Sequence, residues 1–187
     1  MADWRGVLDQ LVRARGRALF GYAYVLTGDR DDAEDLLQDA LVRAFRSGRH
    51  ASSLDAAHVY VKRAIATGFI DRSRRAAARP RTVSVSADLH EWAAAAGLEP
   101  DHAYRVDAAI DLQSALAHLA PRERACTVMR YLDDMPVDQI ADILGLAPGS
   151  VKRYLSDARA HLRHLLPQLD LTDAESVPVT ITERAER

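Results

Sequence analysis

The sequence carries its clearest functional pattern near the C-terminal end, on a predicted helix with two different faces. Apolar side chains recur between Val151 and Leu162 at intervals of four, three and four residues, which predicts a helix that packs by one face. Lysine and arginine donate to base edges and phosphates, and a carboxylate can accept from the amino group of cytosine. These side chains therefore offer the chemistry of DNA recognition: Ser150, Lys152, Arg153, Ser156, Asp157 and Arg159.

A short helix and a tight turn precede this face. Residues 137–144 have helical spacing, Gly145 can take the left-handed backbone that a turn needs, and Pro148 suits the first turn of the next helix. The order is typical of a helix-turn-helix, in which the second helix enters the major groove of DNA. The alternative is an ordinary helical hairpin inside an all-α core.

A second basic face is predicted on a helix from about Asp55 to Arg75. Between Val59 and Arg81 the chain has seven basic residues and one acidic residue. Lys62, Arg63, Thr67, Arg74 and Arg75 point away from the apolar side of this helix, and the polar loop 47–54 precedes it. Such a face can follow phosphates while the loop holds an unstacked base. The alternative is a solvated charged surface.

An acidic strip is predicted on the helix that follows Asp29, which we expect to be its N-cap. Apolar residues from Ala33 to Phe45 have helical spacing and leave a polar side. That side can dock on a basic or polar helix of a partner, or simply keep the protein soluble. Its members are Asp35, Gln38, Asp39 and Arg43.

Composition restricts the class of protein. The formal net charge is −2, but the charged residues are unevenly distributed along the chain. Residues 82–111 have six acidic residues and one basic residue, and residues 167–187 have five acidic and two basic residues. A single cysteine, Cys126, excludes an intramolecular disulfide and a cysteine-based zinc site. The seven histidines are scattered, and no phosphate loop or catalytic triad accompanies them. We expect no enzymatic activity, no cofactor and no metal.

The same patterns predict an all-α protein of two small helical domains joined by a flexible acidic linker. We divide the 187 residues into a first domain at 1–79, a linker at 80–106, a second domain at 107–166 and an acidic tail at 167–187. No apolar run is long enough to span a bilayer and no signal pattern opens the chain, so we expect a cytoplasmic protein.

The chain resembles a known family over residues 19–166. Similarity to the promoter-melting σ2 domain of bacterial extracytoplasmic-function sigma factors, a group of the sigma-70 family, is carried by DAEDLLQDALVRAF (Asp32–Phe45) and AHVYVKRAIATGFIDRSRR (Ala57–Arg75). Similarity to their σ4 domain is carried by APRERACTVMRYLDDMPVDQIADILGLAPGSVKRYLSDARAHL (Ala120–Leu162). The resemblance implies a non-enzymatic factor that binds core RNA polymerase and selects promoter DNA, with an anti-sigma factor as a further partner.

The resemblance also assigns roles to residues. It places the acidic strip where σ2 docks on the clamp helices of the largest polymerase subunit. It assigns the minus-thirty-five element to Ser150, Lys152, Arg153, Ser156, Asp157 and Arg159. It assigns the minus-ten element to Ser47, Arg49, His50, Ser53, Lys62, Arg63, Thr67, Arg74 and Arg75. Three residues depart from the family pattern: Thr67 stands where asparagine is common, and Tyr154 and Asp157 stand where basic residues are common.

Two rival classes remain at this point. One is a helix-turn-helix regulator that binds duplex operators without polymerase, but such a regulator needs an N-terminal sensor or receiver domain, and the alternating strand pattern of a receiver is missing. The other is a helical scaffold without a DNA role, which the two basic faces disfavour.

Overall fold

The structure of the protein is a computed structural model, which describes residues 4–46, 53–76 and 111–166. These residues form helices and turns and no strand, which confirms the all-α prediction for the described parts of the chain. The named helices are α1 (Trp4–Thr27), α2 (Arg30–Arg46), α3 (Leu54–Ala76), α6 (Pro121–Tyr131), α7 (Val137–Leu144) and α8 (Pro148–Leu165). A further helical segment covers residues 111–117.

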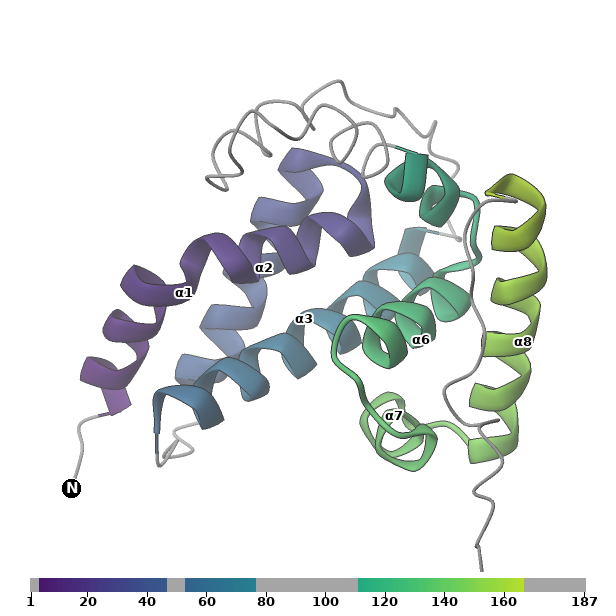
Figure 1. Cartoon of the computed structure of the whole chain (residues 1–187). Helices are drawn as coiled ribbons and strands as arrows, with labels where there is room; N and C mark the ends of the chain where they lie inside the picture. The colour runs from purple at the N-terminus through teal and green to yellow at the C-terminus, as the bar shows by residue number, and fades with distance from the viewer. Residues whose placement is uncertain (1–3, 47–52, 77–110, 167–187) are drawn as a thin grey trace, which may run out of the picture.

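Helices α1, α2 and α3 pack on one another and form the N-terminal bundle (Figure 1). The turn between α1 and α2 contains Gly28 with φ of 75°, and the Asp29 carboxylate accepts a 2.9 Å hydrogen bond from the backbone N–H of Asp32. Asp29 is therefore the N-cap of α2, as predicted. Ser53 caps α3 in the same way, because its hydroxyl oxygen accepts from the backbone N–H of Ala56 at 3.1 Å.

Residues 111–166 form the C-terminal unit, in which α7 and α8 make the predicted helix-turn-helix. Gly145 ends α7 with φ of 62°, and the backbone N–H of Leu146 donates to the Ala141 carbonyl at 2.9 Å. The apolar stripe of α8 is buried as expected: Val151, Leu155, Ala158 and Leu162. The exposed side of α8 is therefore the polar side that the sequence singles out.

Replacing Gly145 with alanine is expected to lower the free energy of unfolding by about 1 kcal/mol, because a side chain at positive φ strains the backbone. A Cβ at this position meets no atom within 4 Å, so the cost is conformational and not steric. Gly149→Ala is the matched control, since Gly149 lies in the first turn of α8 with equal space and no positive φ. Urea unfolding measures both; equal stability of the two variants would refute the turn assignment.

The N-terminal bundle and the C-terminal unit share one apolar core. Helix α6 lies between α3 and α8 (Figure 1), and its buried residues Ala125, Cys126 and Met129 belong to the same cluster as Leu26 and Ile65 of the bundle. Burial raises the pKa of the Cys126 thiol to about 12, so this side chain is an unreactive packing group. The two helical units are thus in contact through apolar surfaces.

Candidate nucleic-acid interface

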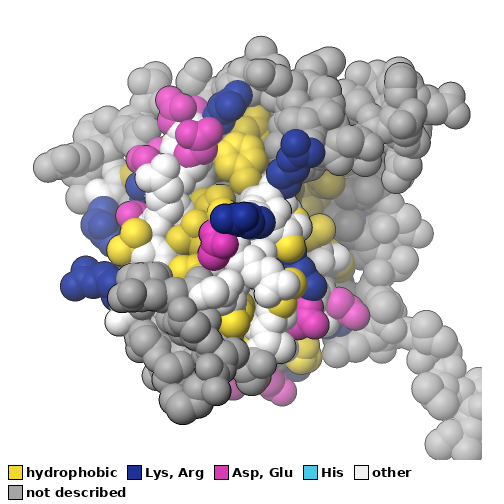
Figure 2. Space-filling model, turned by 90° about the vertical axis from the view of Figure 1, so that its left-hand side faces the viewer, with side chains coloured by type: hydrophobic (Ala, Val, Ile, Leu, Met, Phe, Trp, Pro, Cys, Tyr) yellow, Lys and Arg dark blue, Asp and Glu magenta, His cyan; other side chains and the backbone are white. Residues whose placement is uncertain are grey.

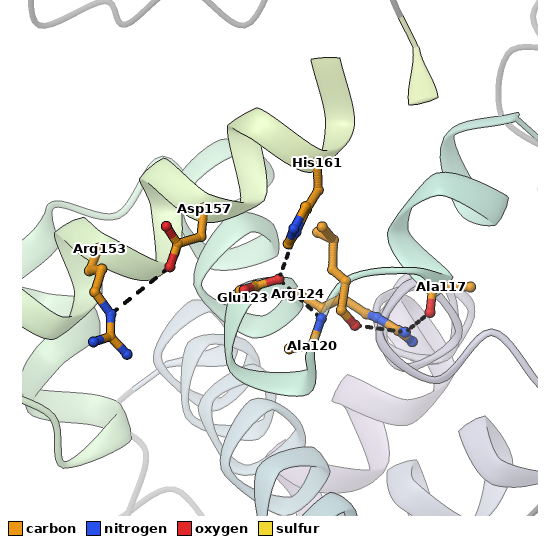
Figure 3. Close-up of polar contacts among 8 residues, drawn as sticks. Ala117, Ala120, Glu123, Arg124, Arg153, Asp157 and His161 are labelled. Atoms are coloured by element: carbon orange, nitrogen blue, oxygen red, sulfur yellow. Dashed lines mark hydrogen bonds and ion pairs between the residues drawn. The ribbon is translucent and has the colours of Figure 1, made fainter. Parts of the chain in front are cut away.

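Helix α8 presents the predicted DNA-contact residues along one side. Lys152, Arg153, Ser156 and Asp157 are exposed, whereas Ser150 and Arg159 are half-buried. Asp157 does not stand alone: its Oδ2 lies 3.9 Å from Nε of Arg153 one turn earlier (Figure 3). Both side chains remain well exposed, so this ion pair contributes little to stability and can open when another partner arrives.

Tyr154, one of the departures from the family pattern, is held in place from α6. Its hydroxyl accepts a 3.1 Å hydrogen bond from Nη1 of Arg122, and the Arg153 guanidinium lies 5.5 Å from the centre of its ring. Tyr154 therefore offers its ring face to the Arg153 guanidinium, even though it supplies no charge of its own.

The packing of α8 on α6 involves residues that the sequence patterns did not single out. Glu123 is almost completely buried; its Oε2 accepts from the backbone N–H of Ala120 at 3.1 Å and lies 3.2 Å from Nδ1 of His161 on α8 (Figure 3). Glu123 makes one half of a capping box, in which a glutamate at the third helical position accepts from the N-cap N–H, but Ala120 has no side-chain oxygen for the other half. The contact with His161 needs the fold.

Arg124, the next residue, joins the two helical units. Its Nη1 donates to the Leu26 carbonyl of α1 at 2.8 Å, and its Nη2 donates to the Ala117 carbonyl at 2.7 Å (Figure 3). The guanidinium also lies 5.7 Å from the ring centre of Phe69. Burial lowers the pKa of Arg124 to about 10, which leaves it charged at neutral pH.

The basic face of α3 is only partly as predicted. Arg74 and Arg75 are exposed, whereas Lys62, Arg63 and Thr67 are half-buried, so only part of the predicted face is open to solvent. Lys62 forms an ion pair with Asp133 of the C-terminal unit. The cause is the second helical unit, which covers this side of α3.

The remaining minus-ten candidates have different environments. The Thr67 hydroxyl donates to the Arg63 carbonyl one turn earlier at 3.0 Å. The Ser53 hydroxyl is the α3 cap described above. Ser47, Arg49 and His50 lie outside the described residues.

His58 lies one turn before Lys62 on α3 and is a pH-sensitive neighbour of this face. Its pKa is lowered below the usual 6.5, first by burial and then by the positive charges of Lys62 and Arg15, with Asp133 and Asp55 acting in the opposite direction. The folded protein therefore disfavours the protonated imidazole more than the unfolded chain does.

Neutral His58 therefore contributes fully to the free energy of unfolding above the unfolded-chain pKa of 6.5. This contribution decreases as the pH falls from 6.5 towards the lower pKa of the folded protein. We expect His58→Gln to reduce the loss of thermal stability between pH 7.5 and pH 5.5. His164→Gln is the control, because His164 is exposed on α8. Thermal melts at the two pH values test the effect, and identical pH slopes for wild type and His58→Gln would contradict it.

The acidic strip is exposed on α2. Asp35, Gln38 and Asp39 are all accessible, and Nη2 of Arg72 on α3 lies 3.4 Å from Asp35 and 3.7 Å from Asp39. Arg43 lies on the same helix, 3.9 Å from Asp71. The structure thus brings all four predicted strip residues to one accessible region, where Arg72 balances part of the negative charge.

Figure 2 shows the side of the molecule that lies at the left of Figure 1, where α1 begins. Acidic and basic side chains are interspersed there around a strip of apolar side chains. A mixed surface of this kind produces no strong field of either sign. The described residues on this side of the molecule therefore present both charges together instead of a basic patch.

Within the described ranges, no helix is long and apolar enough to cross a membrane. The same ranges contain no group of three or more histidine, cysteine, aspartate or glutamate side chains placed to hold a metal ion.

Comparison with known proteins assigns both halves of the chain. Residues 11–79 match the family model for sigma-70 region 2, and residues 109–162 match that for sigma-70 region 4. The extracytoplasmic-function (ECF) RNA polymerase sigma factor SigM of Mycobacterium tuberculosis is 34% identical over 171 residues, covering 91% of this chain and 82% of SigM. This chain belongs to the extracytoplasmic-function sigma factors.

Other relatives agree with this assignment. The RNA polymerase sigma-E factor of Streptomyces avermitilis is 32% identical over 181 residues, covering 96% of this sigma factor and 92% of the relative. The solved sigma factor RpoE of Bartonella quintana, in complex with the anti-sigma factor NepR, has a TM-score of 0.56 and 21% identity, and the match covers 87% of this chain and 98% of RpoE. The likeness to RpoE supports the fold.

Proposed function

We propose that this sigma factor binds core RNA polymerase in the cytoplasm and directs initiation at a specific promoter, while the polymerase performs all catalysis. The observation that carries the proposal is the presence, on one sigma-70 chain, of an exposed acidic strip on α2 and of a helix-turn-helix whose second helix exposes Lys152 and Arg153. The division into functional units at 1–79 and 107–166, with a linker and an acidic tail, belongs to this proposal.

Each surface receives one role. The strip of Asp35, Gln38, Asp39 and Arg43 docks on the polymerase. The face of α3 and the preceding loop contact the minus-ten element, with Arg74 and Arg75 the most accessible of the described residues. The exposed side of α8 contacts the minus-thirty-five element, where early residues of a recognition helix meet base edges.

In vitro transcription with purified core polymerase and a library of promoter fragments tests this function. We expect the chain to co-elute with core polymerase and to direct initiation from a defined subset of the library. A regulator that acts without polymerase would instead retain duplex DNA by itself and start no transcript. Failure both to bind core polymerase and to direct any start site would refute the proposal.

Asp157 is the residue with which we test promoter choice. Replacing it with arginine removes the Arg153 contact at 3.9 Å and adds a positive charge beside DNA. We expect either a changed base preference in the upstream element or a general rise in affinity, the latter with a salt slope steeper by about 0.9 if the new side chain meets a phosphate. Selection from a randomised upstream element and binding at several salt concentrations measure both; no change in either would show that Asp157 points away from DNA.

A further inference from the structure

The sequence contains few side chains that attack an acyl donor and form a stable product. Amines and thiols are the nucleophiles of this kind, and the chain has two lysines and one cysteine: Lys62, Lys152 and Cys126. Every other basic residue apart from histidine is an arginine, whose guanidinium stays charged and does not react in this way. All three nucleophiles lie within the described residues, so the structure shows the surroundings of each.

Two of the three are shielded by the fold. Cys126 is buried in the core, and burial raises the pKa of its thiol to about 12, which leaves almost no thiolate at neutral pH. The Lys62 side chain is 19% exposed and forms an ion pair with Asp133, whose side chain is 3% exposed. The Lys62 amine also lies 4.5 Å from the ring centre of Tyr22, so little of it is open to a reagent in solvent.

Lys152 has the opposite environment. It is exposed in the second turn of α8. Asp157 is the one acidic residue of α8, and its carboxylate lies 3.9 Å from Nε of Arg153, so the acid of this helix is engaged by a different side chain (Figure 3). The chain therefore presents one accessible side-chain amine, and that amine lies in the middle of the surface proposed to contact DNA.

The charge of α8 favours an anionic acyl donor. The helix contains four lysine or arginine residues and one acidic residue, and a basic surface raises the local concentration of anions. An acyl phosphate carries its reactive carbonyl group next to a phosphate. The cations that would attract DNA phosphates therefore also bring this carbonyl group towards the Lys152 amine.

We propose that Lys152 is an acyl-acceptor site for acyl phosphates, and that acylation weakens the contact of α8 with the upstream promoter element. The effect on promoter binding rests on the proposed function, because it assumes that α8 contacts DNA. The location of the site rests only on the burial and exposure of the three nucleophiles.

The reaction balances without a further reagent. The Lys152 ammonium first loses a proton to water, and the electron pair of the amine attacks the carbonyl carbon of the acyl phosphate. A nitrogen–carbon bond forms, the bond between that carbon and the phosphate oxygen breaks, and the phosphate leaves with the electron pair and takes up the second proton from nitrogen. The product is a neutral amide, so the exposed side of α8 loses one positive charge.

Mass spectrometry of the full chain after treatment with acetyl phosphate tests the location of the site. We expect acetylation of Lys152 while Lys62 remains largely unmodified. The same treatment in urea is the control, because unfolding removes the protection of Lys62 and both lysines should then react at similar rates. Equal rates in the folded protein would overturn the proposal. Acetyl coenzyme A is used in a parallel reaction, and modification by this thioester alone would contradict the assignment to acyl phosphates.

Promoter binding by the assembled holoenzyme tests the effect. Acetylated wild type, combined with core polymerase, is expected to bind the promoter mapped by transcription about tenfold more weakly than untreated wild type. Lys152→Gln, which removes the charge permanently, should bind as weakly as the acetylated protein. Lys152→Arg keeps a charge but accepts no acyl group, so its affinity should be the same before and after treatment.

Lys152→Arg also controls for other reactive groups, since it retains Lys62 and the amine of the first residue. An equal loss of affinity in treated Lys152→Arg, or full affinity of wild type acetylated at Lys152, would overturn the proposed effect. If untreated wild type forms no promoter complex, the proposed function fails, whereas the acetyl yields at Lys62 and Lys152 still decide where the chain is acylated.

Protection by DNA provides a measurement that needs no variant. A holoenzyme bound to its promoter should become acetylated at Lys152 more slowly than the same holoenzyme without DNA, because the amine is covered when α8 lies in the groove. Equal rates with and without promoter DNA would show that Lys152 does not face DNA, and would contradict the proposed effect of acylation.

Discussion

Reversing the charge of Asp39 to arginine is expected to weaken binding of core RNA polymerase by about 100-fold, which corresponds to about 3 kcal/mol. Asp39 lies on the exposed side of α2, and its side chain is 58% accessible, so a docking partner reaches it without any rearrangement. An arginine there repels a basic partner and also lies beside Arg72, now 3.7 Å from the carboxylate. Titration of labelled factor with core polymerase measures the loss.

The control for this reversal is Asp9→Arg on α1. Asp9 is an exposed acidic residue of the same bundle, 64% accessible and paired with Arg13 one turn later, but it lies outside the acidic strip. We expect Asp9→Arg to keep wild-type affinity and both variants to keep the helical circular dichroism spectrum. Unchanged affinity of a folded Asp39→Arg variant would remove the docking role from the strip.

Replacing Arg124 with methionine is expected to lower the free energy of unfolding by about 3 kcal/mol and the melting temperature by about 10 °C. Methionine is about as long as arginine's aliphatic stem but donates no hydrogen bond, so the buried Leu26 carbonyl and the half-buried Ala117 carbonyl lose charged donors at 2.8 and 2.7 Å. Removing the buried charge offsets part of this loss, because burial already disfavours the guanidinium and lowers its pKa to about 10.

Arg122→Met is the matched control, because Arg122 lies two residues earlier on the same helix and is exposed. Its Nη1 donates to the Tyr154 hydroxyl within the C-terminal unit. We expect its melting temperature to stay within about 2 °C of wild type, as is usual for surface substitutions. Differential scanning calorimetry compares the two. A similar small shift for Arg124→Met would show that Arg124 does not join the two units.

The helices of this protein were largely predictable, because each has a local cause. Asp29 starts α2 and Gly145 ends α7 through hydrogen bonds and backbone angles that involve only neighbouring residues. The stripe from Val151 to Leu162 has the period of a helix that packs by one face, and α8 does so. The acidic strip and the exposed side of α8 follow from the same period, since residues opposite a buried stripe must face outward.

The sequence alone therefore determined the helices, their polar faces and the family resemblance, because caps, turns and periodicity depend on residues close together in the chain. Only the tertiary structure decided which polar face remains open. Lys62 and Asp133 are 71 residues apart, and Arg124 donates to a carbonyl 98 residues away. Local sequence patterns relate only residues that are close in the chain, so they cannot predict these contacts. Burial of such groups depends on how the two helical units pack on each other. That packing is driven by burial of apolar surface on α1, α3 and α6 together, which no single motif describes.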